Sequence, residues 1–208
     1  DVSMGPDGAL YVIDMYRGII QDHIFLTDQL RDEALSRGLD KPVGMGRIWR
    51  VTAQTQSNIA TQAVPETDRD LVKLLAHENS WHRETAQRLL AGKRSNRTDR
   101  RLRRLINEEN ALAAAHATWT LQGRGKLNRK AVKSGLSHPA PDVQLAALRA
   151  GHDQLNEQSL LQLAASQNQD LAHHATMYLQ SHNESESVMT FLASELANWW
   201  QHPIRRAG

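Results

Sequence analysis

Apolar residues recur with two different periods along this chain. In residues 1–52 they alternate with polar residues over short stretches, which is typical of β-strands. From Thr67 onward they recur every three or four residues, which is typical of amphipathic helices. The polar stretch 53–66 contains no such period and is interpreted as a linker. The pattern therefore predicts a β-rich part (1–52), a linker (53–66) and a helical part (67–208).

The β-rich part is predicted to contain a hairpin. Gly5-Pro6-Asp7-Gly8 separates two apolar stretches, and this tetrapeptide suits a turn because proline presets φ, aspartate caps its own backbone and glycine accepts positive φ. A third strand is predicted over 46–51, and a helix from about Thr27 to Arg37 with Gly38 as its stop. Three strands cannot bury a core alone, so we expect them to need a packing partner.

The helical part is predicted to be a repeat. Nine helical segments are expected, at 68–76, 81–90, 98–106, 111–121, 127–136, 142–152, 158–165, 171–179 and 188–200. When the second helix of each pair is aligned, small residues coincide at spacings of 31, 29 and 29, and four residues later a second column of apolar residues follows. The first column is Ala86, Ala117, Ala146 and Ala175, and the second is Leu90, Leu121, Ala150 and Leu179.

Small residues at one position let repeated helices approach closely, and apolar residues one turn later fill the shared core. The fold class predicted from this pattern is mainly α. We expect a HEAT-like α-solenoid of about five helical hairpins, preceded by a short antiparallel β segment, which acts as a scaffold and not as a catalytic centre.

Composition narrows the chemistry available to the chain. Its 208 residues include no cysteine, which excludes disulfides, thiolate metal sites, cysteine nucleophiles and CxxCH haem attachment within it. No apolar run approaches the roughly 18 residues that cross a membrane. The net charge of +2 is too small to indicate a partner. Because the chain opens on Asp1 inside a predicted strand, we expect it to be a fragment of a longer protein.

Three stretches together resemble a known family. They are Gly5-Pro6-Asp7-Gly8-Ala9-Leu10-Tyr11-Val12-Ile13-Asp14-Met15-Tyr16-Arg17-Gly18-Ile19-Ile20-Gln21, then Leu39-Asp40-Lys41-Pro42, then Gly46-Arg47-Ile48-Trp49-Arg50-Val51. They resemble the last β-propeller blade of bacterial membrane-bound dehydrogenase-like or PVC-type haem-binding proteins, whose propellers are similar to those of sorbosone and soluble glucose dehydrogenases. The segments 83–90 and 116–121 resemble the first two HEAT repeats that follow the propeller in that family.

The resemblance implies a function for the parent protein. It would oxidise sugars or other alcohols and pass electrons to haem, using pyrroloquinoline quinone with calcium, or c-type haem, as cofactor. Its partners would be the missing propeller blades and a cytochrome c domain carrying CxxCH, and it would be periplasmic or otherwise exported. This chain alone is expected to hold no cofactor and to be inactive, because one blade cannot form a site that a whole propeller encloses.

Chemically versatile side chains follow the second predicted strand. Asp14, Tyr16 and Arg17 could bind a substrate or cofactor, and His23 with Asp22 could act catalytically, the imidazole taking a proton as hydride leaves. The favoured alternative is structural: Asp14 pairs with Arg17 to anchor a long loop, and Tyr16 packs beneath it.

Basic residues concentrate between 93 and 104. Arg97, Arg100, Arg103 and Arg104 are predicted to share the outer face of one helix, where they could bind an acidic partner protein. Nucleic acid is a weaker alternative, because no aromatic residues interleave with the arginines for base stacking. The favoured interpretation is a solvated face partly neutralised by Glu108 and Glu109.

No metal site is predicted. The ten histidines include no HxxxH or HExxH pattern, and the adjacent pair His173-His174 points in two directions on a helix. Trp199-Trp200 are expected to cover the last repeat.

Two functions therefore remain in view: a fragment of a propeller–HEAT dehydrogenase-like protein, or a HEAT-repeat protein-binding module without redox chemistry.

Overall fold

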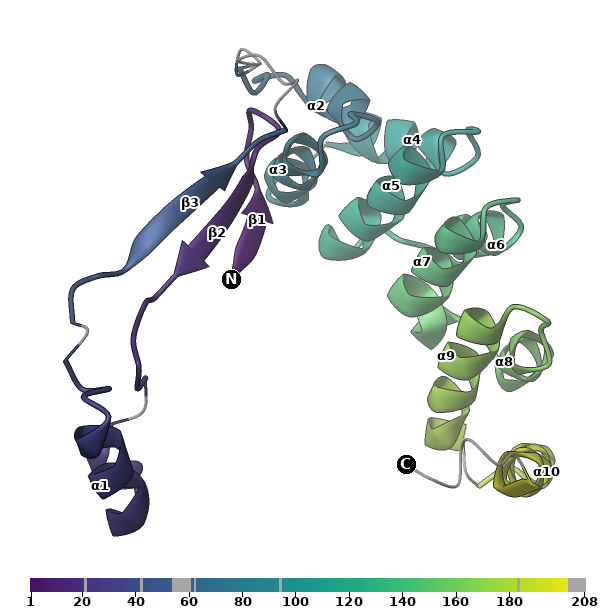
Figure 1. The fold of residues 1–208 in the computed structure, drawn as a ribbon. Helices are drawn as coiled ribbons and strands as arrows, with labels where there is room; N and C mark the ends of the chain where they lie inside the picture. The colour runs from purple at the N-terminus through teal and green to yellow at the C-terminus, as the bar shows by residue number, and fades with distance from the viewer. Residues whose placement is uncertain are drawn as a thin grey trace. The chain divides into compact units, whose positions relative to one another are not determined.

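The computed structural model describes residues 1–20, 22–41, 43–53, 61, 63–93, 95–182 and 184–201. Most of the predicted linker lies outside these residues, and so do the side chains of Trp199 and Trp200. The chain forms two compact units: residues 1–63 together with 79–81, and residues 64–78 together with 82–208 (Figure 1). Each is described by itself.

The first unit is a three-stranded antiparallel sheet with one helical excursion. Strands β1 (Val2–Met4), β2 (Leu10–Asp14) and β3 (Arg47–Val51) lie in the order β1-β2-β3. The predicted turn joins β1 to β2, with Gly8 at φ +75° and the amide of Gly5 donating to the carbonyl of Ala9 at 2.8 Å. The predicted hairpin and third strand are thus both present.

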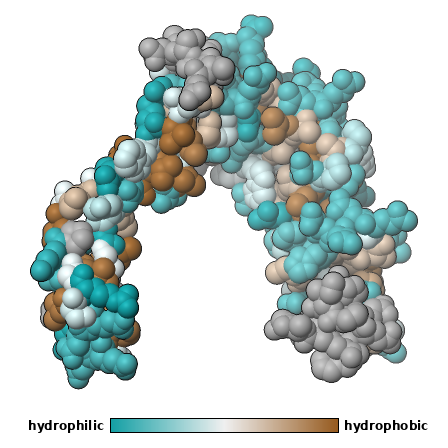
Figure 2. Space-filling model, viewed as in Figure 1, coloured by the Kyte–Doolittle hydropathy of each residue, from teal (hydrophilic) through white to brown (hydrophobic). Residues whose placement is uncertain are grey.

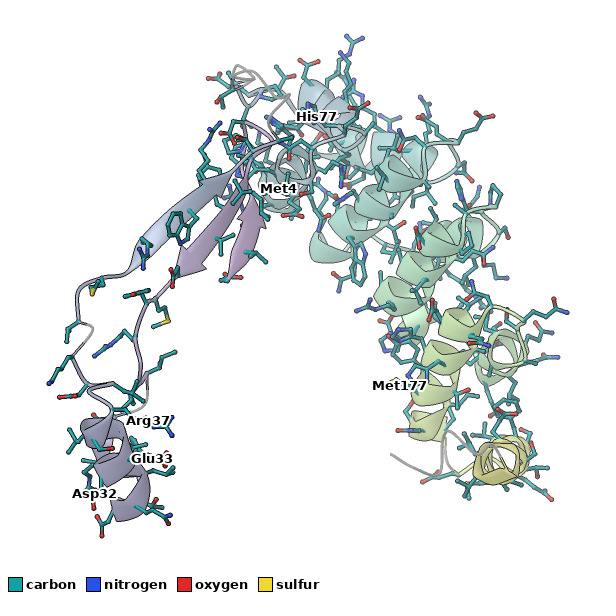
Figure 3. The ribbon with its side chains drawn as sticks, viewed as in Figure 1. Met4, Asp32, Glu33, Arg37, His77 and Met177 are labelled. Atoms are coloured by element: carbon teal, nitrogen blue, oxygen red, sulfur yellow. The ribbon has the colours of Figure 1, made fainter. Side chains whose placement is uncertain are left out.

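Between β2 and β3 the chain forms the 3₁₀ helix η1 (His23–Phe25) and helix α1 (Asp28–Ser36). Thr27 caps α1, and Gly38 follows its end at φ +64°, as the sequence predicts. Arg37 and Glu33 form an ion pair of 2.6 Å on this helix (Figure 3).

The sheet has one apolar face, and that face is exposed. Directly opposed residues of neighbouring strands point to the same side, so this face carries Val2, Met4, Leu10, Val12, Trp49 and Val51, with the polar pair Asp14 and Arg47 at one end. Apart from half-buried Val12, the apolar side chains of this face are 37–61% exposed, and Figure 2 shows hydrophobic surface over the strands. Within the first unit, therefore, the sheet leaves most of this face uncovered.

The second unit is a stack of helices. Its helices are α2 (Asp68–Leu74), α3 (Ser80–Ala91), α4 (Asn96–Leu105), α5 (Ala111–Gly123), α6 (Arg129–Leu136), α7 (Pro141–Gly151), α8 (Glu157–Ala164), α9 (Gln169–Leu179) and α10 (Glu186–Gln201), with 3₁₀ turns η2 (His152–Gln154) and η3 (Gln180–His182). All nine predicted segments are helical. The described residues thus form a mainly α fold with a short antiparallel β segment, as predicted.

The helices form two layers. Helices α5, α7 and α9 stack side by side in one layer, which α3 begins, and α2, α4, α6, α8 and α10 form the other (Figure 1). Consecutive helices pair closely in α4/α5, α6/α7 and α8/α9; α2 and α3 precede these hairpins, with α2 against α4, and α10 follows against α8. None of the described helices has the length and apolarity needed to cross a membrane.

The repeat column predicted from sequence lies at the centre of this stack. Ala86, Ala117 and Ala175 are fully buried, one each on α3, α5 and α9, and Ala146 of α7 is almost so. The residues one turn later are buried as well, and they join leucines of the outer layer in one continuous core. Small side chains therefore set the spacing of the inner layer.

A buried ion pair joins α4 to the end of α5, and its arginine also bonds to α3. Arg124 Nε donates to Asp99 Oδ1 at 2.7 Å, and both side chains are almost completely buried. Arg124 Nη1 also donates to the carbonyl of Leu90 at the end of α3, and Nη2 to that of Ser95 at 3.3 Å. One guanidinium thus donates to a carbonyl at the end of α3, to a carbonyl at the start of α4 and to the buried carboxylate of Asp99. It can do so because α5 ends beside α3 and α4.

Glycines allow a close contact between α6 and α7. A Cβ added to Gly135 would lie 2.6 Å from the Cβ of Ala147, whereas one added to Gly123 would lie an ordinary 3.5 Å from the Cβ of Ala91.

We predict that Gly135→Ala lowers the free energy of unfolding by about 1–3 kcal/mol through overpacking. Gly123→Ala should leave it unchanged or raise it by up to about 1 kcal/mol, because alanine favours helix. Urea unfolding of both variants checks this, and equal effects would contradict the packing described.

Candidate functional site

The end of β2 carries a polar and aromatic cluster centred on Asp14. Asp14 stands opposite Arg47 in the β2–β3 register, and Trp49 lies on the same face as Arg47. Asp14 Oδ2 accepts hydrogen bonds from Arg47 Nε and from Trp49 Nε1, each at 3.1 Å, while Oδ1 accepts from the amide of Tyr16 at 2.9 Å. Three donors therefore fix one carboxylate where the strand ends.

Aromatic rings enclose the guanidinium of the same cluster. The Arg47 guanidinium carbon lies 4.1 Å from the ring centroid of Tyr16 and 5.1 Å from that of Trp49. Tyr16 has a positive φ, +42°. Among the described residues, all the others with positive φ are glycines. A positive φ at tyrosine costs free energy that the amide hydrogen bond to Asp14 and the cation–π contact offset. The cluster therefore holds Tyr16 in a conformation it rarely takes.

The charge state of Asp14 follows from these contacts. The hydrogen bond from Trp49 is the largest cause that lowers the pKa of Asp14 below its usual value, and the Tyr16 amide and Arg47 add to the effect against desolvation. Asp14 is thus a carboxylate at neutral pH, with its lone pairs already engaged. It can orient neighbouring groups, or a polar ligand beside Arg47, more readily than it can act as a general acid.

The structure brings together two of the five residues predicted for this site. Asp14 and Tyr16 belong to the cluster, but the ion pair recorded for Asp14 is to Arg47 and not to Arg17. Asp22 immediately precedes η1. Its carboxylate lies 3.5 Å from the amide nitrogen of Ile24, and its carbonyl accepts a hydrogen bond from the amide of Phe25 at 3.0 Å. The side chain of His23 lies outside the described part of the structure.

Sequence reasoning missed Arg47 and Trp49. Their signal was available, because the predicted strand 46–51 pairs antiparallel with the second hairpin strand and alternate residues share a face. That register places Arg47 opposite Asp14.

A second cross-strand cluster lies on the opposite face of the sheet. Asp7 Oδ2 accepts from Arg50 Nε at 2.7 Å and from the Tyr11 hydroxyl at 3.1 Å, and Tyr11 and Arg50 are paired in register. The Arg50 hydrogen bond is the main cause of the lowered pKa of Asp7. Together the two clusters tie β3 to the hairpin from both faces.

In the helical unit, a polar cluster joins α3 to α5. Arg83 Nε donates to His116 Nε2 at 3.2 Å, so the proton of this imidazole lies on Nδ1, which donates to Gln87 Oε1 at 2.7 Å. Burial is the first cause of the lowered pKa of His116, and the charge of Arg83 is the second. The imidazole is therefore held neutral, as a structural bridge between the two helices.

The basic residues predicted to bind a partner lie on α4. Arg97, Arg100 and Arg104 are exposed, whereas Arg103 is half-buried and its Nη2 donates to the carbonyl of Lys126 at 3.0 Å. Arg103 thus points to the α5–α6 connection and not to the outer face. No ion pair to Glu108 or Glu109 is recorded in the described part of the chain.

Histidine, aspartate and glutamate side chains do not gather in threes or more around a possible metal position in the described residues. His173 and His174 meet edge to face at 5.6 Å between ring centroids.

Comparisons with known proteins found one match, which covers the first part of the chain. The model of a domain of unknown function, DUF7133, matches residues 1–55. Neither the curated proteins nor the solved structures contain a match to this chain. The matched range contains the whole sheet and both cross-strand clusters.

We predict that the indole N–H of Trp49 reports the ionisation of Asp14. Its NMR resonance should shift as pH falls, with a midpoint below the ordinary aspartate value of 3.8, because the hydrogen bond stabilises the carboxylate. Asp14→Asn should abolish this titration. A midpoint at or above 3.8, or a titration that survives in the variant, would contradict the cluster.

We also predict a pH-dependent contribution of His116 to stability. Its folded-state pKa lies below the ordinary 6.5, so the unfolded chain binds more protons near that pH. The stability that neutral His116 confers is complete above pH 6.5 and is lost as pH falls through the lowered pKa. Urea unfolding from about pH 7.5 to about pH 5 should show a larger loss for the wild type than for His116→Gln. Equal losses would show that this imidazole is not held neutral.

Proposed function

We propose that the first unit is the last blade of a β-propeller in a protein of the dehydrogenase-like, PVC-type haem-binding kind, and that the helical repeats scaffold this propeller. The parent protein would oxidise sugars or other alcohols and pass electrons to haem, outside the cytoplasm. The observation that carries the proposal is the exposed apolar face of the sheet, from Val2 to Val51. A propeller blade needs such a face, because it packs against the neighbouring blade.

The position of the Asp14 cluster supports the same proposal. Asp14, Tyr16 and Arg47 lie where β2 ends and β3 begins, and loops at the strand ends of a propeller line its ligand face. In this assignment Asp14 orients Arg47 toward a polyol hydroxyl or a quinone oxygen. Arg17, Asp22 and His23, which follow in the same loop, remain candidates for contact with the reacting groups.

By this proposal, parts of the parent protein outside this chain bind the cofactor. The chain has no cysteine for CxxCH attachment, and the acidic and histidine residues of its described part form no group suited to calcium. Pyrroloquinoline quinone with calcium, or c-type haem, would therefore be held by other blades or by a cytochrome c domain. When bound, it would accept the hydride or electrons from the substrate.

The test uses the complete gene product that contains residues 1–208. We expect further Pro-Asp-Gly hairpins upstream, a CxxCH downstream and dye-linked oxidation of a sugar or alcohol. Asp14→Ala should lower kcat/KM by roughly tenfold or more, because it releases Arg47. Asp28→Ala, on exposed α1, is the matched control and should not. A complete product that oxidises no sugar or alcohol, or that lacks further blades, would refute the proposal.

A further inference from the structure

Helix α4 presents a stripe of arginines to solvent. Arg97, Arg100, Arg101 and Arg104 fall within one face, because an α-helix has 3.6 residues per turn. Arg97, Arg100 and Arg104 are exposed, and Arg101 is half-buried. In the described part of the chain none of the four forms an ion pair. The only acidic residue of α4, Asp99, is buried and already paired with Arg124. The stripe therefore carries uncompensated positive charge.

A groove of about 470 Å³ flanks this stripe on the side of α2. Arg69 and Lys73 of α2 face Arg101 and Arg104 of α4 across it, with Glu108 as its only acidic lining residue. Its apolar lining comes from Val72, Ala76 and Leu105. Lys73 is paired with Asp70 at 2.8 Å, so among the described residues Arg69, Arg101 and Arg104 supply the unpaired positive charge of the rim, and the walls of the groove are aliphatic.

A second groove, of about 760 Å³, lies beyond the end of α4, against α6. Arg129, Lys130 and Lys133 line it, and no acidic residue does. Ile106 and Pro139 supply apolar atoms. The basic surface therefore continues from α2 across α4 to α6, one outer-layer helix after another.

We propose that the outer face of α2, α4 and α6 is a docking surface for an acidic, amphipathic protein segment. Its carboxylates pair with the arginines of α4 and the basic groove rims, and its aliphatic side chains enter the two grooves. Arginine suits this role because its guanidinium binds a carboxylate through two parallel hydrogen bonds. The inference goes beyond the propeller assignment and does not depend on it.

The lining of the grooves favours a protein over a nucleic acid. No phenylalanine, tyrosine or tryptophan lines either groove. The His138 ring in the second groove is buried, with both nitrogens bonded to the backbone at Glu108 and Ala140, so neither groove offers an open platform on which bases stack. The aliphatic lining gives a phosphate backbone nothing to bind, whereas leucine or valine side chains of a peptide would bury apolar surface there.

The test measures binding of a fluorescent helical peptide to the full chain. The peptide has about 18 residues, or about 27 Å as a helix, with glutamate at most positions and leucine at every third or fourth. Two comparison peptides replace glutamate with glutamine, or leucine with serine. A duplex DNA of similar length is the fourth probe. The variants are Arg104→Glu and Lys133→Glu in the surface, and Arg88→Glu on α3 as a control with the same charge change.

We expect the Glu/Leu peptide to bind most tightly, and Arg104→Glu and Lys133→Glu each to weaken it by roughly tenfold. Arg88→Glu should leave its affinity unchanged, and circular dichroism should show all three variants equally helical. If Arg88→Glu weakened peptide binding as much as the two surface variants do, the effect would come from the net charge of the protein and not from this surface, which would overturn the proposal. Tighter binding of the DNA, binding that does not depend on leucine, or no binding of the Glu/Leu peptide would also overturn it.

Discussion

Apolar surface must be covered, and the two units of this protein meet that requirement in different ways. A helical hairpin covers its apolar stripe by stacking on the next hairpin, so a row of hairpins builds a core of its own. In the second unit that core runs from Leu71 to Leu179 without interruption. A three-stranded sheet has two faces and too little chain to cover either. Val2, Met4, Trp49 and Val51 therefore stay exposed within the first unit.

This difference explains where polar chemistry gathers. In the sheet, cross-strand clusters around Asp7 and Asp14 supply the cohesion that burial does not, and each fixes an arginine of β3. The Asp14 cluster thereby positions Arg47 and Tyr16 at a strand end, where a ligand could reach them. In the helical unit both layers contribute side chains to the core, so the outward faces of the outer helices can carry the arginine stripe and its grooves.

Much of the fold could be predicted from the sequence because its signals are local. Helices begin at residues that cap them, such as Thr67, Ser95 and Asn110, and the side chain of each accepts an amide of the first turn. The 3.6-residue period located all nine helices of the second unit, and the alanine column identified its inner layer. Turn chemistry alone located the hairpin.

The pairings of charged side chains could not be predicted, because they depend on register and on helix ends far apart in the sequence. The structure pairs Asp14 with Arg47, 33 residues away, and not with its neighbour Arg17. Asp99 forms its buried pair with Arg124, 25 residues away, and not with one of the arginines beside it in the sequence. Arg103 was predicted to lie on the outer face, but its guanidinium donates a hydrogen bond to the carbonyl of Lys126 and so points away from that face.

Native-state hydrogen exchange on the 208-residue chain tests most directly the claim that the helices carry the core while the sheet lacks a cover. Amides of α5, α7 and α9 should exchange slowly, at rates set by unfolding of the whole helical unit. Amides of β1, β2 and β3 should exchange much faster, because little buried surface stabilises their hydrogen bonds. Strands as strongly protected as those helices would contradict the account, since the sheet would then be stable without any partner.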